Sequence, residues 1–219
     1  MADETWKSVK SNIEHYSTSL GPYFAHQALE SPRHLLFTYS RYKFARSMLP
    51  VTGGSRVLEL GCNEGLCSLM LMERASHLTA VDFDSQAVAH AQAHIEHDDI
   101  DFICRDFLGE TLGCYDAVIS LDVIEHIAPE KEALFFDTID QNLERDGICL
   151  IGTPNATAAA HASRESQLGH VNLFTAERLE AAMQERFRNV FMFGMNDEVL
   201  HTGFFPMCHY LFALGSCRR

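Results

Sequence analysis

The sequence predicts an α/β fold: a seven-stranded, mostly parallel sheet with one antiparallel strand, helices on both faces and a helical cover at the N-terminus. Two observations support this prediction. From residue 56 onward, short apolar runs alternate with amphipathic segments, which is the pattern of strands joined through helices into a parallel sheet. The chain has 219 residues, 47% of them hydrophobic, which is enough to bury one substantial core. We therefore expect a single domain over residues 1–219, with residues 1–50 as the cover and residues 51–219 as the sheet and its helices.

Seven apolar runs are predicted to be strands. In chain order they are residues 56–60, 77–83, 100–106, 115–121, 147–153, 189–195 and 209–215. The last two are separated only by a loop at residues 196–208, which is too short for a crossover helix. Successive strands joined in this way are usually antiparallel, so we expect one reversed strand near the edge of the sheet.

Amphipathic segments between these runs are predicted to be helices. They cover residues 64–74, 85–97, 130–144 and 175–187. The last is the clearest, because Thr175 is a good N-cap residue and the apolar residues that follow fall on one helical face. In the cover, a helix over residues 32–49 is expected to open with Ser31 as N-cap and Pro32 at the first helical position.

The charge balance argues against a nucleic-acid partner. The formal net charge is −13, from 17 Lys and Arg against 30 Asp and Glu. Phosphate contacts are made largely by Lys and Arg, so the sequence favours a small-molecule substrate.

Cysteine usage and hydropathy indicate the compartment. The seven cysteines are scattered and never spaced C-x-x-C, which is typical of reduced thiols rather than of a disulfide or zinc framework. The N-terminal stretch MADETWKSVK is polar, and no run of about 18 apolar residues occurs. We expect a soluble cytoplasmic protein that does not enter the membrane, and the sequence does not indicate its oligomeric state.

A glycine turn follows the first predicted strand, in the stretch VLELGCNEG. Gly61 and Gly65 bracket this turn, where the absence of Cβ lets a ligand or a neighbouring backbone approach closely. Ligands of parallel α/β sheets bind at the carboxyl ends of the strands, so Glu59 is expected at the lip of a ligand crevice.

Two further carboxylates end the second and third predicted strands. Asp82 is placed to accept hydrogen bonds from ribose hydroxyls, although an N-cap role for the helix starting near Ser85 is the alternative. Asp106 is followed by Phe107, an aromatic that could bracket an adenine ring. Three strand ends that each supply a carboxylate favour an adenosine-containing ligand.

The segments VLELGCNEG, AVDFD, CRDF and YDAVISLDVIEHI together resemble the core of class I S-adenosylmethionine-dependent methyltransferases, over residues 56 to about 155. The resemblance implies a Rossmann-like fold with S-adenosyl-L-methionine as cofactor. It implies that the glycine turn passes under the methionine part, that Asp82 binds the ribose and that Asp106 binds the adenine amino group. The family's commonest turn is G-x-G-x-G, and Asn63 replaces its middle glycine here. The cofactor-binding residues implied are Glu59, Gly61, Asn63, Gly65, Asp82, Phe83, Asp106, Phe107 and Leu121.

Acidic and histidine side chains gather in three segments that follow predicted strands. Asp122, Glu125 and His126 follow the fourth strand at i, i+3 and i+4, and share one face if the chain turns helically there. A long polar loop after the fifth strand carries His170, and the loop after the sixth carries His201. Loops of this length in a compact domain are usually functional, and we expect all three to converge on the mouth of the crevice.

Three interpretations of this cluster remain open. In the first, Asp122, Glu125, His126 and His170 bind a divalent metal, Mn, Fe, Zn or Mg; the D-x-x-E-H element with a distant histidine resembles the metal site of small-RNA 2′-O-methyltransferases. In the second, His126, His170 or His201 is a general base that removes the acceptor proton. In the third, Glu125 and His126 only order the loop beneath the cofactor.

The function predicted from the sequence is methyl transfer to a small polar acceptor, expected to be a hydroxyl oxygen of a sugar or related metabolite, with or without a metal. The segments PRHLLFTYSRYKFA and GHVNLFT are similar to parts of bacterial methyltransferases associated with surface polysaccharides, which is the basis for naming sugars. A metal-dependent RNA 2′-O-methyltransferase and a non-catalytic S-adenosylmethionine-binding protein are the alternatives. A nicotinamide dehydrogenase is disfavoured, because GCNEGL lacks the G-x-G-x-x-G fingerprint.

Overall fold

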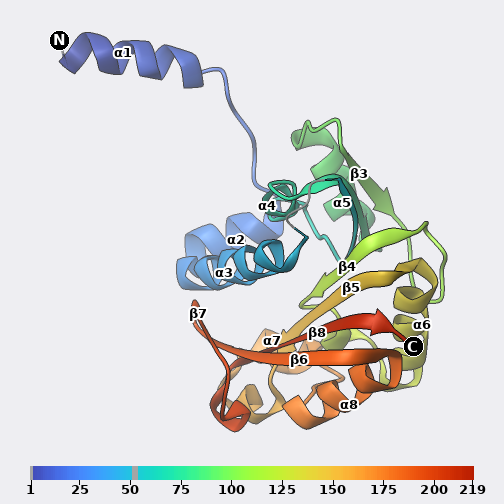
Figure 1. Cartoon of the computed structure of the whole chain (residues 1–219). Coiled ribbons are helices and arrows are strands. Elements are labelled where there is room, and N and C mark those ends of the chain that lie inside the picture. Colours follow the sequence, from blue (N-terminus) through green and yellow to red (C-terminus); the bar gives the residue numbers. More distant parts are fainter. Residues whose placement is uncertain (1, 51–53) are drawn as a thin grey trace.

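The computed structural model describes residues 2–50 and 54–219, and these residues are organised around one eight-stranded sheet. The strands are β1 (Ser55–Leu60), β2 (Ala75–Asp82), β3 (Ile100–Cys104), β4 (Tyr115–Leu121), β5 (Leu143–Pro154), β6 (Phe187–Asn196), β7 (Val199–His201) and β8 (Tyr210–Arg218). Their order across the sheet is β3-β2-β1-β4-β5-β8-β6-β7 (Figure 1). Neighbouring strands among β1 to β5 are parallel, and β8 is antiparallel to both β5 and β6. All seven predicted strands are present, and the mostly parallel Rossmann-like architecture is confirmed.

The eighth strand, β7, lies in the segment that was expected to be a loop. It pairs antiparallel with β6, with Gly194 opposite His201 and Asn196 opposite Val199. The segment also contains a short 3₁₀ helix, Phe205–Met207. Three residues are too few to show an alternating pattern, so the sequence did not reveal this strand. Two strands, β7 and β8, therefore run against the rest, where one was predicted.

The helices follow the predicted order, with different lengths. They are α1 (Ala2–Ile13), α2 (Pro22–Glu30), α3 (Pro32–Met48), α4 (Ser68–Leu71), α5 (Ser85–His94), α6 (Glu132–Asn142), α7 (Arg164–Gly169) and α8 (Ala176–Arg186), with 3₁₀ helices η1 (Ile124–His126), η2 (Pro129–Lys131) and η3 (Ala156–His161). Thr175 caps α8 by accepting a hydrogen bond from the Arg178 amide, and Pro32 opens α3, as predicted. The helix expected at residues 64–74 is reduced to the single turn α4, since the glycine turn takes up the residues before it.

The long polar segment after β5 is more ordered than the expected loop. It contains η3, capped by the Asn155 side chain, and α7, capped by Ser163. Asn155 also forms an isolated parallel bridge with Phe174. These contacts fix the position of His170 directly after α7.

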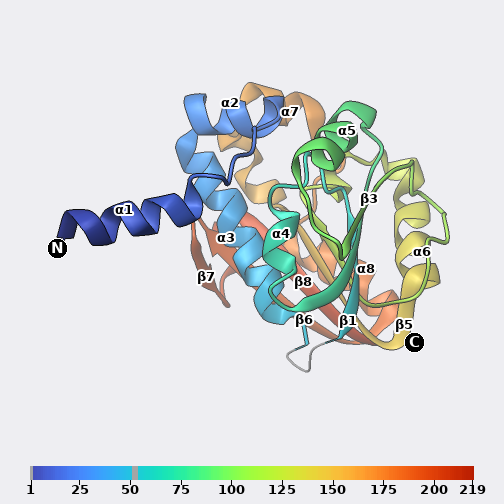
Figure 2. The ribbon, with the colours of Figure 1, turned by 90° about the horizontal axis from the view of Figure 1, so that it is seen from above.

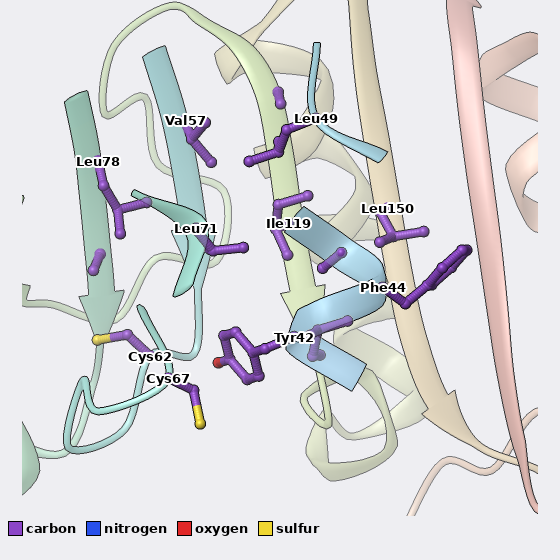
Figure 3. Packing of buried hydrophobic residues seen from close by; sticks show 14 of the residues in the cluster. Tyr42, Phe44, Leu49, Val57, Cys62, Cys67, Leu71, Leu78, Ile119 and Leu150 are labelled. Carbon is purple, nitrogen blue, oxygen red and sulfur yellow. The ribbon is translucent and has the colours of Figure 1, made fainter. Parts of the chain in front are cut away.

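Helices cover both faces of the sheet and enclose two cores. On one face α3 packs on the sheet, and its Tyr42 and Phe44 belong to one buried cluster with Val57, Ile119 and Leu150 (Figure 3). On the other face α6 and α8 bury a second cluster, whose largest fully enclosed members include Phe135, Phe174 and Phe187. Each such side chain contributes about 1.5–3 kcal/mol on leaving water. The cover helices α2 and α3 thereby become part of the main fold.

Helix α1 stands apart from this body. Figures 1 and 2 both show it pointing away from the sheet and its helices. Residues 3–20 are all exposed. No helix in the described part of the chain has the length and apolar content that a membrane crossing requires.

Candidate active site

The glycine turn after β1 contains positive φ angles, a backbone conformation that residues with side chains rarely adopt. Gly61 and Gly65 have φ of 85° and 74°, and Asn63 between them also has a positive φ of 51°, a region where Asn is better tolerated than most residues. A Cβ on Gly61 would lie 2.2 Å from Cγ2 of Val123. The turn therefore needs its glycines for packing as well as for the approach of any ligand.

Asp82 ties this turn to the end of β2. Its Oδ2 accepts a hydrogen bond from the Asn63 amide at 2.8 Å, and its Oδ1 accepts one from the Asp84 amide at 2.9 Å. The N-cap of α5 is Asp84, which accepts from the amides of Gln86 and Ala87, so the N-cap alternative for Asp82 was wrong. Both Asp82 oxygens keep a second lone pair that could receive a ligand hydroxyl.

Glu59 lies beneath the turn rather than at its lip, which corrects the expected position. The residue is 1% exposed. Its carboxylate accepts hydrogen bonds from the hydroxyls of Tyr42 and Ser68, each at 2.6 Å. Burial raises the pKa of Glu59, against the lowering effect of these two hydrogen bonds. Glu59 thus joins α3 and α4 to the end of β1, and direct contact with the cofactor stays a prediction.

The remaining predicted cofactor residues differ in exposure. Asp106 is exposed and accepts a hydrogen bond from the Leu108 amide at 3.2 Å. Phe107 is buried in the second core cluster and Leu121 in the first. Phe83, at the end of β2, is 75% exposed, so it is the more available aromatic for stacking on a base.

Glu64 is a site residue that the sequence reasoning missed. It stands inside the glycine turn, is 4% exposed, and accepts hydrogen bonds from the amides of Tyr23 at 2.8 Å and Phe24 at 3.0 Å. These are amides of the first turn of α2, where Gly21 supplies no side-chain cap. The side chain therefore fastens the cover to the cofactor turn. The glutamate within the glycine turn is visible in the sequence. Its role was missed because its hydrogen-bond partners lie about forty residues upstream.

Asp122 is held by the cover and does not join the histidines. Both of its carboxylate oxygens accept hydrogen bonds from Nη1 of Arg41 at 2.8 Å, and Cζ of Arg41 lies 4.0 Å from the centre of the Tyr210 ring. The helical turn on which a shared face of Asp122, Glu125 and His126 depended does not include Asp122, because Asp122 has φ of 58° and η1 begins only at Ile124.

Glu125, His126 and His170 do come together, as expected. Their candidate ligand atoms all lie within 4.8 Å of one another, and no other group of this kind occurs among the residues that the structure describes. The rings of His126 and His170 meet edge to face with centres 4.9 Å apart. Nδ1 of His126 lies 3.0 Å from the Gly169 carbonyl oxygen. A carbonyl only accepts, so Nδ1 carries the proton and Nε2 is free for a ligand or a proton.

Glu125 is the most constrained member of this cluster. It is fully buried, and its Oε2 accepts a hydrogen bond from the Thr153 hydroxyl at 3.0 Å. Within the described residues, its buried Oε1 has no hydrogen-bond partner. Burial, and secondarily the charge of Asp122, raises the pKa of Glu125 to about 8. Burial, and then the neighbouring His126, lowers the pKa of His170.

His201 does not reach the cluster. It lies on β7, where its Nε2 is 3.5 Å from Sγ of Cys208. The segments after β4 and β5 therefore come together as predicted, and a role for His201 stays a prediction.

A mostly parallel, doubly wound sheet with a glycine turn after its first strand is an architecture that binds nucleotide and nucleoside ligands at the carboxyl ends of its strands. A family model described as a methyltransferase domain matches residues 24–187. The chain belongs to this family, the class I S-adenosylmethionine-dependent methyltransferases.

Individual relatives agree with this assignment. A ubiquinone biosynthesis O-methyltransferase of Xylella fastidiosa is 26% identical over 156 residues, which cover 69% of this chain and 62% of the relative. This chain thus matches less than two-thirds of that protein's length. Among solved structures, DhpI in complex with S-adenosylhomocysteine (SAH) has a TM-score of 0.63 at 18% identity, covering 87% of this chain and 88% of the other. The N-methyltransferase NodS from Bradyrhizobium japonicum, also with SAH, has a TM-score of 0.59 at 18% identity, covering 84% and 86%. These structures share the fold.

Proposed function

We propose that the protein transfers a methyl group from S-adenosylmethionine to a hydroxyl oxygen of a small polar acceptor, such as a sugar or a related metabolite. The observation that carries this proposal is a glycine turn tied to Asp82 in a chain that also brings together His126, after β4, and His170, after α7. The resemblance to ubiquinone biosynthesis O-methyltransferases supports oxygen as the acceptor atom. The net charge of −13 opposes an RNA acceptor.

The cofactor would lie along the carboxyl ends of β1 to β3. In this proposal Gly61, Asn63 and Gly65 pass under the methionine part, Asp82 accepts from the ribose hydroxyls, and Asp106 with Phe83 or Phe107 meets the adenine. Because the sulfonium is already activated, the protein mainly aligns the acceptor with the methyl group and removes the acceptor proton.

His126 and His170 are the candidates for removing that proton. The hydrogen bond of His126 to Gly169 leaves Nε2 available, and the lowered pKa of His170 keeps its ring neutral near pH 7. A neutral imidazole can accept a proton from a hydroxyl within hydrogen-bond reach. His201 contacts Cys208 instead and is not a member of this pair.

A metal-assisted reaction is the second candidate, and the unpartnered Oε1 of buried Glu125 favours it. Glu125, His126 and His170 would hold the ion, and one carboxylate with two imidazoles suits Mn, Fe or Zn better than Mg. A bound divalent ion would lower the pKa of an acceptor hydroxyl as a Lewis acid. Asp122 is not part of this proposed ligand set.

Calorimetric titration with SAH tests the cofactor assignment. We expect binding that weakens at least about tenfold in Asp82→Asn, since a lost hydrogen bond to a charged group costs about 1.5–3 kcal/mol. Asp84→Asn is the matched control, because Asn also caps helices well, and its affinity should stay within about threefold. Absence of SAH binding by the wild-type protein would refute the proposed function. Binding without methyl transfer to any hydroxyl acceptor would indicate a non-catalytic binding protein.

Metal content measured on the purified protein, before and after chelation, separates the two candidates. If a metal assists, Glu125→Gln and His170→Ala lose a stoichiometric ion while Asp122→Asn keeps it. A metal-free protein that still transfers methyl groups would leave the histidine base as the mechanism.

A further inference from the structure

The outer edge of β6 is only partly covered by another strand. One edge of β6 pairs with β8 from Phe187 to Met195, whereas on the other edge β7 pairs only with residues 194–196 (Figure 1). Among the residues that the structure describes, no strand therefore pairs with residues 187–193 on that side. We call this stretch the open edge. A free strand edge presents unpaired amides and carbonyls that can bind a further strand.

The open edge lacks the features by which proteins usually protect a strand edge. Its sequence, FRNVFMF, contains no proline, and Arg188 is its one charged residue. The side chain of Phe191 is 54% exposed. Exposed strand edges are normally shielded by lysines, prolines, bulges or a covering loop. A β-prone, nearly uncharged edge with an exposed aromatic ring therefore indicates a surface that pairs with another chain.

The hairpin that joins β6 to β7 shows which residues of the open edge can form backbone hydrogen bonds outward. Asn196 and Val199 flank its two-residue turn and pair with each other, so the backbone amide and carbonyl of Asn196 point toward β7. Because this direction alternates along a strand, the same groups of Met192, Val190 and Arg188 point outward. Val190 is the middle residue of the open edge, so an identical antiparallel strand can pair with it symmetrically about Val190.

This register also places an exposed side chain of one copy over a hollow in the other. In the symmetric pairing, Phe191 of one copy lies directly opposite Asn189 of the second copy, on the same face of the sheet. Beside the open edge is a hollow of about 400 Å³, lined by Gln184, Arg188, Asn189, Val190, Phe191 and Arg219. The two-fold axis repeats the contact, so each copy supplies one aromatic ring and one hollow. The two arginines of the hollow can stack on that ring.

We propose that the protein forms a symmetric dimer in which the open edges of two copies pair antiparallel, with Val190 opposite Val190. The two eight-stranded sheets then join into one continuous sheet, and Phe191 of each copy fills the hollow of the other. Strand β7 keeps its place, because this register uses only residues that β7 leaves free. A register centred on Met192 would require Gly194 and Asn196, which already pair with β7. The dimer does not depend on the identity of the methyl acceptor.

Sedimentation velocity on the full chain tests the dimer. At about 100 μM, where a dimer with a Kd of about 10 μM is mostly assembled, the wild-type protein should have twice the 24.6 kDa mass of one chain. Phe191→Lys should weaken self-association at least about tenfold, because it replaces the inserted ring with a charge that faces two arginines. Phe204→Lys is the matched control. Phe204 is 70% exposed and lies outside the open edge, so the dimer should persist.

Cysteine cross-linking tests the register. Residues in a hydrogen-bonded antiparallel pair have Cα atoms about 5.5 Å apart, which a disulfide can span. Val190→Cys should therefore give a covalent dimer when the protein is treated with oxidised glutathione. Asn189→Cys lies opposite Phe191 rather than opposite itself, so it should give no more covalent dimer than the wild-type protein, whose own exposed cysteines set the background.

Three results would overturn the proposal. A wild-type protein that is monomeric at about 100 μM would leave the open edge to a different partner. A dimer that survives Phe191→Lys would use another surface. Cross-linking through Asn189→Cys as readily as through Val190→Cys would exclude the symmetric register. If Phe191→Lys fails to fold, as judged by circular dichroism, the cross-linking of Val190→Cys decides instead.

Discussion

The carboxylate of Glu59 connects the cover, α4 and the end of β1 by hydrogen bonds, and the cofactor turn depends on these contacts. It accepts hydrogen bonds from the hydroxyls of Tyr42 in the cover and Ser68 in α4, and it is buried. A buried carboxylate keeps such a position only when its lone pairs are satisfied. At the scale of single residues, the hydroxyl of Tyr42 should therefore contribute to stability through its hydrogen bond to Glu59.

Tyr42→Phe should lower the free energy of unfolding by about 1–3 kcal/mol, because it leaves a buried carboxylate oxygen of Glu59 without its donor. Tyr39→Phe on the same helix is the control and should change it by less than about 0.5 kcal/mol, since the Tyr39 hydroxyl makes no hydrogen bond to any described residue. Urea denaturation measures both. Equal losses in the two variants would contradict the assigned role.

The raised pKa of Glu125 predicts that the stability of the metal-free protein depends on pH. Its pKa is raised by burial from 4.5 to about 8, so the folded state binds the proton more tightly than the unfolded state does. Stability contributed by this group is present at low pH and is lost as pH rises from about 4.5 to 8. Glu125→Gln should flatten the decline in unfolding free energy over that window, measured by denaturation with chelator present. An unchanged slope would mean that Glu125 is ionised in the folded protein.

At the scale of elements, the hydrogen bonds between α2 and Glu64 of the cofactor turn hold the cover in position. Glu64→Ala should remove the acceptor of the Tyr23 and Phe24 amides and cost about 1–2 kcal/mol, as the loss of an N-cap does. Hydrogen exchange should then accelerate at those two amides and along α2. Asp84→Ala, which uncaps α5 instead, is the control and should accelerate exchange in α5 only. Protection of α2 that survives Glu64→Ala would show that hydrophobic packing alone holds the cover.

Elements with strong local signals were predictable, and those set by distant contacts were not. Thr175 and Pro32 mark helix starts because their effects act within one turn. Asp122 was misplaced because it has a left-handed backbone and pairs with Arg41, a residue far away in the sequence. The strand β7 exists only through its pairing with β6, and a pattern of three residues carries no period.

At the scale of the whole molecule, the order of strands explains why so much of the site could be inferred. Parallel neighbours place the ends of β1, β2 and β4 at one edge, so the glycine turn, Asp82 and the Glu125–His126 pair had to approach one another. The position of the cover did not follow from that rule. The sequence predicted helices before residue 50, but the pairs Tyr42–Glu59 and Arg41–Asp122 that seat them on the sheet arise only from packing.

Helix α1 projects away from the folded body, so we expect it to contribute little to stability (Figures 1 and 2). Removal of residues 1–13 should change the free energy of unfolding by less than about 0.5 kcal/mol and leave SAH affinity unchanged, because residues 3–13 are exposed and α1 projects away from the sheet (Figures 1 and 2). Removal of residues 1–21 should cost about 1–2 kcal/mol, since it also deletes the hydrogen bond from Thr18 to the His94 carbonyl and the contact of Ser19 with His90. Thermal unfolding followed by circular dichroism compares the two, because the single tryptophan, Trp6, is lost from both. A shorter truncation that destabilised as strongly as the longer one would show that α1 contributes to the fold.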